Sequence, residues 1–199
     1  MITDKKSYKF YCQADRLANS IPANEETIKK IIHLVFPNPI RKFLFLLRKT
    51  EYIKNCKRGI FGTLFYLFYF QKLIKISRKL GFSIPLNVFG PGLSIPHYGT
   101  IVVNPLAKVG KNCRLHVCVN IGASGGSELA PKIGDNVYIG PGAIIFGDII
   151  IANNITIAAN ATVFKSIENT DVTIGGTPAI ILKEKTSVWW VKNKVNLER

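Results

Sequence analysis

From residue 109 to residue 163 an aliphatic side chain returns at every sixth position. The series is broken only at Ser127, inside a Gly- and Ser-rich stretch at 122–132, and its members are Val109, Leu115, Ile121, Ile133, Ile139, Ile145, Ile151, Ile157 and Val163. This period fits neither an α-helix, with about 3.6 residues per turn, nor a two-faced strand, which repeats every second residue. It predicts a chain that turns a corner every six residues, so that three hexads form one triangular coil of a parallel β-helix.

A second series of small or apolar residues follows four positions after the first. It comprises Cys113, Val119, Val137, Ala143, Ile149, Ile155 and Ala161. In the same register it continues toward the N-terminus as Phe89, Ile95, Ile101 and Ala107, while Pro85, Pro91, His97 and Val103 continue the first series. We therefore expect about five coils over residues 84–176. Ordinary β-hairpins are not favoured, because their strands would alternate with a period of two.

The composition indicates a globular chain with a large excess of positive charge. Of the 199 residues 47% are hydrophobic and 20% are charged, and 27 Lys and Arg against 12 Asp and Glu give a net charge of +15. This balance favours a polyanionic partner, either nucleic acid, an anionic membrane or a multiply charged ligand. No nucleic-acid-binding motif is present, so nucleic acid is set aside. Four cysteines without Cys-x-x-Cys spacing indicate a reducing, cytoplasmic location, and no apolar leader segment is recognised.

The first eighty residues are predicted to be helical. The apolar spacing and the Gly and Pro positions indicate helices at Glu25–Phe36, Ile40–Lys57 and Phe61–Leu80, the last ended by Gly81. The predicted organisation is a helical region at 1–82, a β-helix domain at 83–178 and a C-terminal tail at 179–199.

One apolar run within the third predicted helix invites a membrane interpretation. It extends from Ile60 to Phe70, which is shorter than the roughly 20 residues needed to span a bilayer. Basic residues flank the run on both sides, as in helices that lie on an anionic leaflet. The alternative, which we prefer, is that this helix packs against the base of the β-helix or against a neighbouring subunit. Peripheral membrane contact stays open.

Three histidines are candidates for chemistry. His33 lies among aliphatic residues of a predicted helix and is assigned a structural or surface role. His97 occupies a slot otherwise held by apolar residues, which suggests a function, because an imidazole can exchange a proton near neutral pH. His116 follows the inward Leu115, so its side chain should point outward, to the surface or an interface. A catalytic zinc site would need three converging ligands, and no metal is predicted.

Three blocks of sequence carry a resemblance to a known family. They are Pro96–Val103, Pro131–Ala143 and Gly175–Ala179. In their order and spacing they resemble the serine acetyltransferase branch of the hexapeptide acyltransferases. The resemblance implies an α+β chain with a left-handed parallel β-helix, assembled as a homotrimer with sites between subunits. It also implies acetyl-CoA as cosubstrate and His97 as the general base.

The resemblance further implies where the cosubstrate would bind. The pantetheine arm is expected near Gly122, Ala123, Gly142 and Ala143, where small residues let an extended chain approach the backbone. The adenosine and phosphate end is expected near Gly176 and Lys183. For Lys183 a solvated tail is an equally acceptable interpretation.

Two departures from the serine acetyltransferase pattern bear on the acceptor. The family has an acidic residue upstream of the catalytic histidine, at a place that corresponds to about Phe82 here, and no acid occurs between Glu51 and Glu128. The family's second histidine, directly before the second block, is replaced by Ala130. We therefore predict a sugar hydroxyl as acceptor, as in acetyltransferases of capsule, exopolysaccharide or lipopolysaccharide synthesis. The alternatives are a serine O-acetyltransferase of cysteine biosynthesis and a catalytically silent β-helix scaffold.

Overall fold

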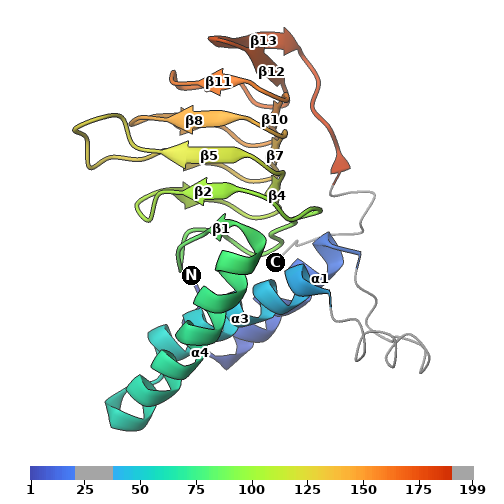
Figure 1. Cartoon of the computed structure of the whole chain (residues 1–199). Helices are drawn as coiled ribbons and strands as arrows, with labels where there is room; N and C mark the ends of the chain where they lie inside the picture. Colours follow the sequence, from blue (N-terminus) through green and yellow to red (C-terminus); the bar gives the residue numbers. More distant parts are fainter. Residues whose placement is uncertain (21–37, 190–199) are drawn as a thin grey trace.

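The computed structural model describes residues 1–20 and 38–189. Within these residues three helices come first, and they are α1 (Lys5–Ala18), α3 (Pro39–Cys56) and α4 (Gly59–Leu80). Short strands follow, stacked as coils above the helices (Figure 1). The predicted helix at 25–36 and His33 lie outside the described residues.

The ends of α3 and α4 are set by local chemistry. The side chain of Asn38 accepts hydrogen bonds from the backbone N–H groups of Ile40 and Arg41, at 2.9 and 3.2 Å, and so caps α3. Helix α4 ends at Gly81, whose φ of 77° lies in the left-handed region that glycine enters freely. The helices predicted at 40–57 and 61–80 are confirmed. Helix α1 was not predicted.

The strands form three sheets that face one another as the sides of a triangular prism. The first face contains β1 (Phe82–Ser83), β2 (Ile101–Val103), β5 (Val119–Gly122), β8 (Ile144–Phe146) and β11 (Thr162–Val163). The second face contains β3 (Lys108–Val109), β6 (Lys132–Ile133) and β9 (Ile150–Ile151). The third face contains β4 (Arg114–Leu115), β7 (Tyr138–Ile139), β10 (Thr156–Ile157), β12 (Thr173–Gly176) and β13 (Ala179–Lys183).

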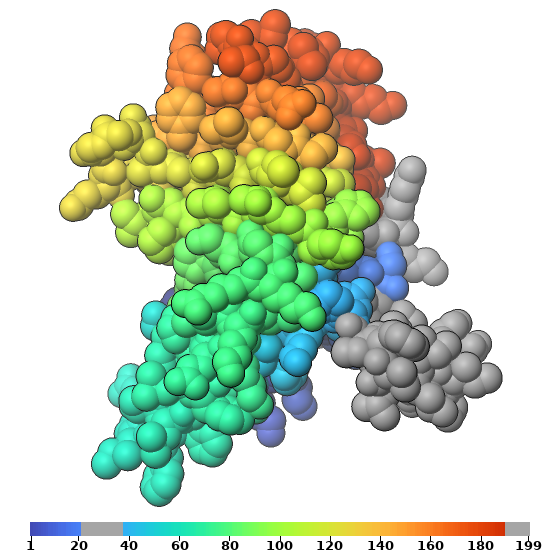
Figure 2. All heavy atoms as spheres, in the orientation of Figure 1, coloured from blue at the N-terminus to red at the C-terminus, as the bar shows by residue number. Residues whose placement is uncertain are grey.

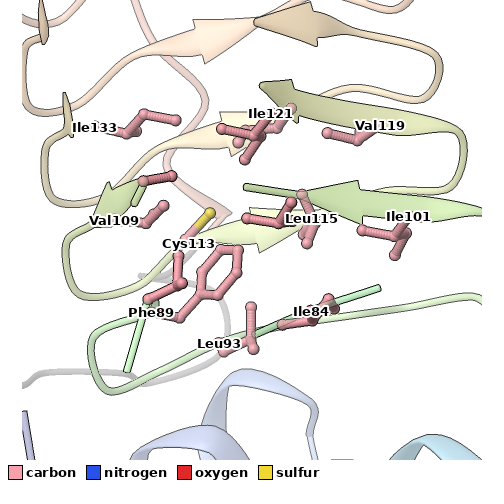
Figure 3. Close-up of a cluster of buried hydrophobic side chains, with 14 of the residues drawn as sticks. Ile84, Phe89, Leu93, Ile101, Val109, Cys113, Leu115, Val119, Ile121 and Ile133 are labelled. Carbon is pink, nitrogen blue, oxygen red and sulfur yellow. The ribbon is translucent and has the colours of Figure 1, made fainter. Parts of the chain in front are cut away.

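Every pairing between successive coils is parallel, and the period-six residues stack inside the prism. Ile121 lies beside Val103 in the coil below and beside Ile145 in the coil above. Cys113 is buried in the same core, and Figure 3 shows it among side chains that point inward from several coils. The predicted helical region followed by a parallel β-helix is therefore confirmed.

The first coil departs from the predicted register. Phe89 bridges to Val109 and Ser94 to Arg114, each twenty positions later, whereas Ile101 pairs with Val119, eighteen positions later. Two extra residues are therefore accommodated in the corner between Ile95 and Ile101. The slots predicted for Pro85, Pro91 and His97 are wrong for this reason. Phe89 and Ile95, which were predicted as inward members of the second series, are buried but occupy slots of the first series, and His97 moves to an exposed corner.

The underside of the first coil is covered by α1 and α3 through a buried ionic cluster. Arg48 Nε lies 2.7 Å from Asp15 Oδ2, and Arg48 Nη1 lies 3.0 Å from Glu51 Oε2. The same guanidinium donates hydrogen bonds to the carbonyl groups of Phe89 and Gly90, at 2.9 and 2.7 Å. We call Asp15, Arg48 and Glu51 the charge cap.

The two carboxylates of the charge cap also bind backbone groups of the first coil. Asp15 Oδ1 accepts from the N–H groups of Gly92 and Leu93, both at 2.9 Å, and Glu51 Oε1 accepts from the N–H group of Asn87 at 2.8 Å. These backbone groups have no coil beneath them, and buried N–H and C=O groups need partners. The charge cap therefore replaces the hydrogen bonds that a preceding coil would supply.

The corners between the second and third faces carry a ladder of side-chain hydrogen bonds. Asn112 donates to Asn136 at 2.8 Å, Asn136 to Asn154 at 2.8 Å, and Asn154 to Asp171 at 3.0 Å. All four residues have a φ between 56° and 61°, a conformation that Asn and Asp tolerate better than other side chains. We call this series the asparagine ladder.

The stretch predicted as a tail at 179–199 begins as a strand. β13 pairs antiparallel with β12 and closes the last coil. The chain then runs back along the third face (Figure 1), where the N–H group of Ser187 donates to Thr156 Oγ1 at 2.7 Å. Trp189 packs against Ala14 and Ala18 of α1. Residues up to 189 therefore form a strap that joins the top of the coils to the helices.

No helix within the described residues has both the length and the apolar character needed to cross a bilayer.

Candidate active site

His97 lies in the corner between the third and first faces. This corner, Pro96–Thr100, has five residues, whereas the corner above it, His116–Cys118, has three. The longer loop carries the imidazole of His97 away from the core, where it is exposed. The ring centre of His97 lies 6.2 Å from that of His116, which in turn lies 4.9 Å from the ring centre of Tyr138.

His116 lies on the same edge and is half-buried. Burial, and then the positive charge of Arg114 and the neighbouring His97, lowers the pKa of His116 to about 4. Its ring is therefore neutral at neutral pH, and its Nε2 has no hydrogen-bond partner among the described residues. No three His, Cys, Asp or Glu side chains come together as metal ligands would in residues 1–20 and 38–189.

The corners between the third and first faces stack into one continuous edge. The N–H group of Cys118 donates to the carbonyl group of Thr100 at 2.6 Å, and that of Gly142 donates to Val117 at 2.9 Å. Gly142, with a φ of 73°, and Gly176, with a φ of 95°, lie higher on the same edge. We call this column the histidine edge. It brings three of the predicted site residues, His97, Gly142 and Gly176, to one border of the prism.

Of the other predicted cosubstrate residues, Gly122, Ala123 and Lys183 lie away from the histidine edge, and Ala143 directly follows Gly142 on it. Gly122 ends β5 at the opposite border of the first face, and Ala123 begins the loop that projects from the coils after β5 (Figure 1). The side chain of Ala143 is fully buried in the core, so only its backbone could meet a ligand. Lys183 pairs with Thr173, at the far end of the β12–β13 hairpin from Gly176. One chain alone therefore does not gather all the predicted residues into one groove.

A polar cavity of about 340 Å³ adjoins the histidine edge. It lies between α1, α3 and the third face, and its lining includes Asn19, Ser94, Pro96 and Arg114. Asn19 holds the nearby strand through hydrogen bonds with the backbone of Leu93, at 2.8 Å, and of Ile95, at 3.0 Å. His97 is not part of the lining, but Pro96, which directly precedes it, is. Arg114 supplies positive charge there.

Sequence reasoning missed Arg114 and Tyr138 as members of this site. Each directly precedes an inward residue of the period-six series, Leu115 and Ile139, so each side chain points outward on the third face. The signal was therefore present. Outward positions one coil apart stack above one another, and reading the polar residues along that stack would have placed both beside His116.

Comparisons with known proteins agree with the coil architecture. Residues 130–165 match the family described as bacterial transferase hexapeptide (six repeats). The chain is 33% identical over 105 residues to a serine acetyltransferase of Mycobacterium tuberculosis, and the match covers 52% of this chain and 46% of that protein. The chain thus spans about half the length of this curated relative.

Solved structures extend the likeness over nearly the whole chain. The serine acetyltransferase of Brucella abortus aligns with a TM-score of 0.65 and 26% identity, covering 91% of this chain and 69% of that one, and it has also been solved with coenzyme A. The Neisseria gonorrhoeae enzyme in complex with serine aligns with a TM-score of 0.67 and 24% identity, over 90% of this chain and 70% of that one. The coil domain therefore has a left-handed parallel β-helix fold, and it is similar to these serine acetyltransferase structures.

The comparisons contradict the predicted sugar acceptor. The relatives and structures described above are serine acetyltransferases and not enzymes of polysaccharide synthesis. The prediction relied on two absent polar groups, an acid upstream of His97 and a histidine at Ala130. Missing residues at two positions are weaker grounds than a likeness over the whole coil domain, because other side chains can supply the same charges.

Proposed function

We propose that the chain is an acetyl-CoA-dependent serine O-acetyltransferase in which His97 is the general base. The observation that carries the proposal is the exposed imidazole of His97, placed by an enlarged corner on the edge that also holds Gly142 and Gly176. The likeness to serine acetyltransferases supports the reaction class.

The reaction needs one group that accepts a proton and later returns it. The neutral imidazole of His97 takes the proton from the serine hydroxyl as the oxygen attacks the thioester carbonyl. The carbon–sulfur bond then breaks, and the proton passes to the departing sulfur, which leaves O-acetylserine and the coenzyme A thiol. General base catalysis of this kind contributes about 10²- to 10⁴-fold in rate. Backbone N–H groups at the coil corners could stabilise the oxyanion.

The histidine edge fits the extended arm of the thioester. Gly142 and Gly176 have no side chain to obstruct a chain lying along the edge. Gly122 and Ala123 lie across the first face from His97, so they reach the same arm only if they belong to a neighbouring copy. We therefore propose a homotrimer with the site between subunits.

We assign recognition of the serine carboxylate to Arg114, one of two arginines that line the cavity. It lines the cavity beside Pro96, and its charge acts on the ring of His116, which neighbours His97. A guanidinium pairs well with a carboxylate through two parallel hydrogen bonds. This cation would orient the acceptor without the acidic residue that the family pattern places upstream.

The first test measures acetyl transfer from acetyl-CoA to L-serine, with release of the coenzyme A thiol as the readout. We expect His97→Ala to lower kcat by at least about 100-fold with coenzyme A binding retained. Tyr98→Ala, an exposed change in the same corner, controls for disturbance of the loop. Unchanged turnover in His97→Ala would exclude His97 as the base, and no transfer to serine by the wild type would exclude the proposed acceptor.

The second test concerns the acceptor. We expect Arg114→Met to raise the KM for serine by about 10-fold or more, as the loss of a charge-assisted hydrogen bond predicts, with a smaller change in kcat. Arg114→Lys keeps the charge, so its KM for serine should lie between those of the wild type and Arg114→Met. Equal KM values for all three proteins would contradict the assignment.

A further inference from the structure

The N-terminal half of α4 carries an exposed apolar surface. Its large side chains and their exposed fractions are Ile60 (79%), Phe61 (78%), Leu64 (57%), Phe65 (58%), Leu67 (49%) and Phe68 (52%). The C-terminal half of the same helix packs on the rest of the fold through buried Leu73, Ile76 and Leu80. Figure 1 shows the first turns of α4 extending away from the coils, and Figure 2 shows them as a projection of the molecular surface.

The six side chains form one stripe along the helix. Positions 60, 61, 64, 65, 67 and 68 recur at the spacing that places residues on one side of an α-helix. We call this stripe the apolar tip, residues 60–68. Singly exposed apolar residues are ordinary on protein surfaces, but a continuous patch of this kind marks a contact with another phase or molecule.

Cations follow the apolar tip on both sides. Lys72, Lys75, Arg78 and Lys79 are exposed on the next turns of α4, and Lys57 and Arg58 are exposed just before it. Lys72 Nζ lies 4.0 Å from the centre of the Phe68 ring, so the basic and apolar parts adjoin. No acidic residue occurs in α4, or anywhere between Glu51 and Glu128.

We propose that the apolar tip inserts into an anionic lipid surface while the flanking cations contact its headgroups. Buried apolar area and attraction to anionic lipids together set the strength of such binding. A second copy of this chain fits less well, because a two-fold contact through the same face would bring the cations of both copies together. The inference is independent of acetyl transfer.

The placement of the tip is compatible with an accessible site. The apolar tip and the coils lie at opposite ends of the molecule (Figure 1), so a bound membrane would leave the histidine edge open to solvent. The chain would then be held at a membrane surface without a spanning helix.

Vesicle sedimentation with the full chain tests the proposal. We expect binding to vesicles that contain phosphatidylglycerol, little binding to pure phosphatidylcholine vesicles, and a strong decrease as salt is raised. The double variant Phe61→Ser/Phe65→Ser should bind at least tenfold more weakly, and Lys75→Glu/Lys79→Glu should lose most binding at low salt. Leu106→Ser/Ile150→Ser, which changes two exposed apolar residues of the coils, should bind as the wild type does.

The oligomeric state distinguishes an anionic lipid surface from a second copy of the chain as the partner of the apolar tip. Light scattering without vesicles should give the same mass for the wild type and Phe61→Ser/Phe65→Ser, and far-ultraviolet circular dichroism should show that both are folded. A lower mass for the variant would assign the apolar tip to contacts between copies and overturn the proposal. Absence of wild-type binding to anionic vesicles at low salt would overturn it as well.

Discussion

The middle coils and the base of this molecule satisfy their backbone hydrogen-bonding groups by different chemistry. In the middle coils the strands bond through their backbone groups to the coils above and below, and the interior is filled by aliphatic residues such as Ile121, Ile139 and Ile145. At the base no coil lies below the first one. There the charge cap satisfies the backbone, and the fold buries an arginine with two carboxylates.

The two regions should differ in how much stability they lose when a buried residue is replaced. A buried methyl group lost from a middle coil removes contacts in proportion to its volume, and neighbouring coils can partly relax. A charge lost from the cap leaves the opposite charges buried without a counter-charge, which lowers stability far more. The base should therefore be the more fragile region, although it contains less of the core.

The largest expected effect is at the base. Arg48→Met leaves Asp15 and Glu51 buried without a counter-charge, so we expect the free energy of unfolding to fall by about 3–5 kcal/mol. Urea unfolding followed by circular dichroism measures it. Lys54→Met, an exposed change on the same helix, should shift stability by less than about 0.5 kcal/mol. A loss below about 1 kcal/mol for Arg48→Met would remove the distinction between the two regions.

A middle coil should respond less strongly. Ile139→Ala creates a cavity between Leu115 and Ile157, its partners in the coils below and above, and we expect a loss of about 3 kcal/mol. Ile150→Ala, exposed on the second face, should lose at most about 1 kcal/mol. The same denaturation assay applies. A loss equal to that of Arg48→Met would show that the coils are as fragile as the base.

The asparagine ladder allows conformation and hydrogen bonding to be separated. Asn136→Ala loses two ladder bonds and places alanine at a φ of 59°, so we expect a loss of about 2 kcal/mol. Asn136→Gly loses the same bonds without the backbone strain and should lose about 1 kcal/mol. If Asn136→Ala and Asn136→Gly lowered the thermal unfolding temperature equally, the left-handed backbone conformation would contribute nothing to the loss of stability.

The smallest expected effect is a loss of stability in acid, caused by His116 on the histidine edge. The pKa of His116 is lowered in the fold to about 4, below its usual value of about 6.5. The unfolded chain therefore takes up the proton first, and stability present above about pH 6.5 is lost as the pH falls toward 4. We expect wild type to lose about 1 kcal/mol more than His116→Gln between pH 7 and 4.5, allowing for partial exposure. Parallel pH profiles for the two proteins would contradict the shift.

The middle coils could be predicted because one slot recurs with one chemical requirement. Ile133 to Val163 repeat an aliphatic residue at each inward position, and the three sheets follow from that. The register of the first coil could not be predicted, because two extra residues in the His97 corner shift Phe89 and Ile95 into other slots. Periodicity carries no signal about the length of a loop that breaks it.

The charge cap and the cavity were beyond sequence reasoning for another reason. Asp15, Arg48 and Glu51 have the composition of a solvated helix surface, and only the approach of α1 and α3 to the first coil makes them interior. Helix α1 was missed for the same reason, because its buried face is formed by Tyr11, Ala14, Asp15 and Ala18 and carries no aliphatic stripe. The cavity that Arg114 lines exists only because the third face lies against these helices.

Because the stack of coils is closed at both ends, it holds its two ends a fixed distance apart. The charge cap ends it below and β13 ends it above, so its length can change only by adding or removing whole coils between them. The His97 corner and Gly176 are four coil steps apart on the histidine edge, or about 19 Å at roughly 4.8 Å per step. An inserted coil would lengthen that interval by one fixed increment and leave both ends as they are.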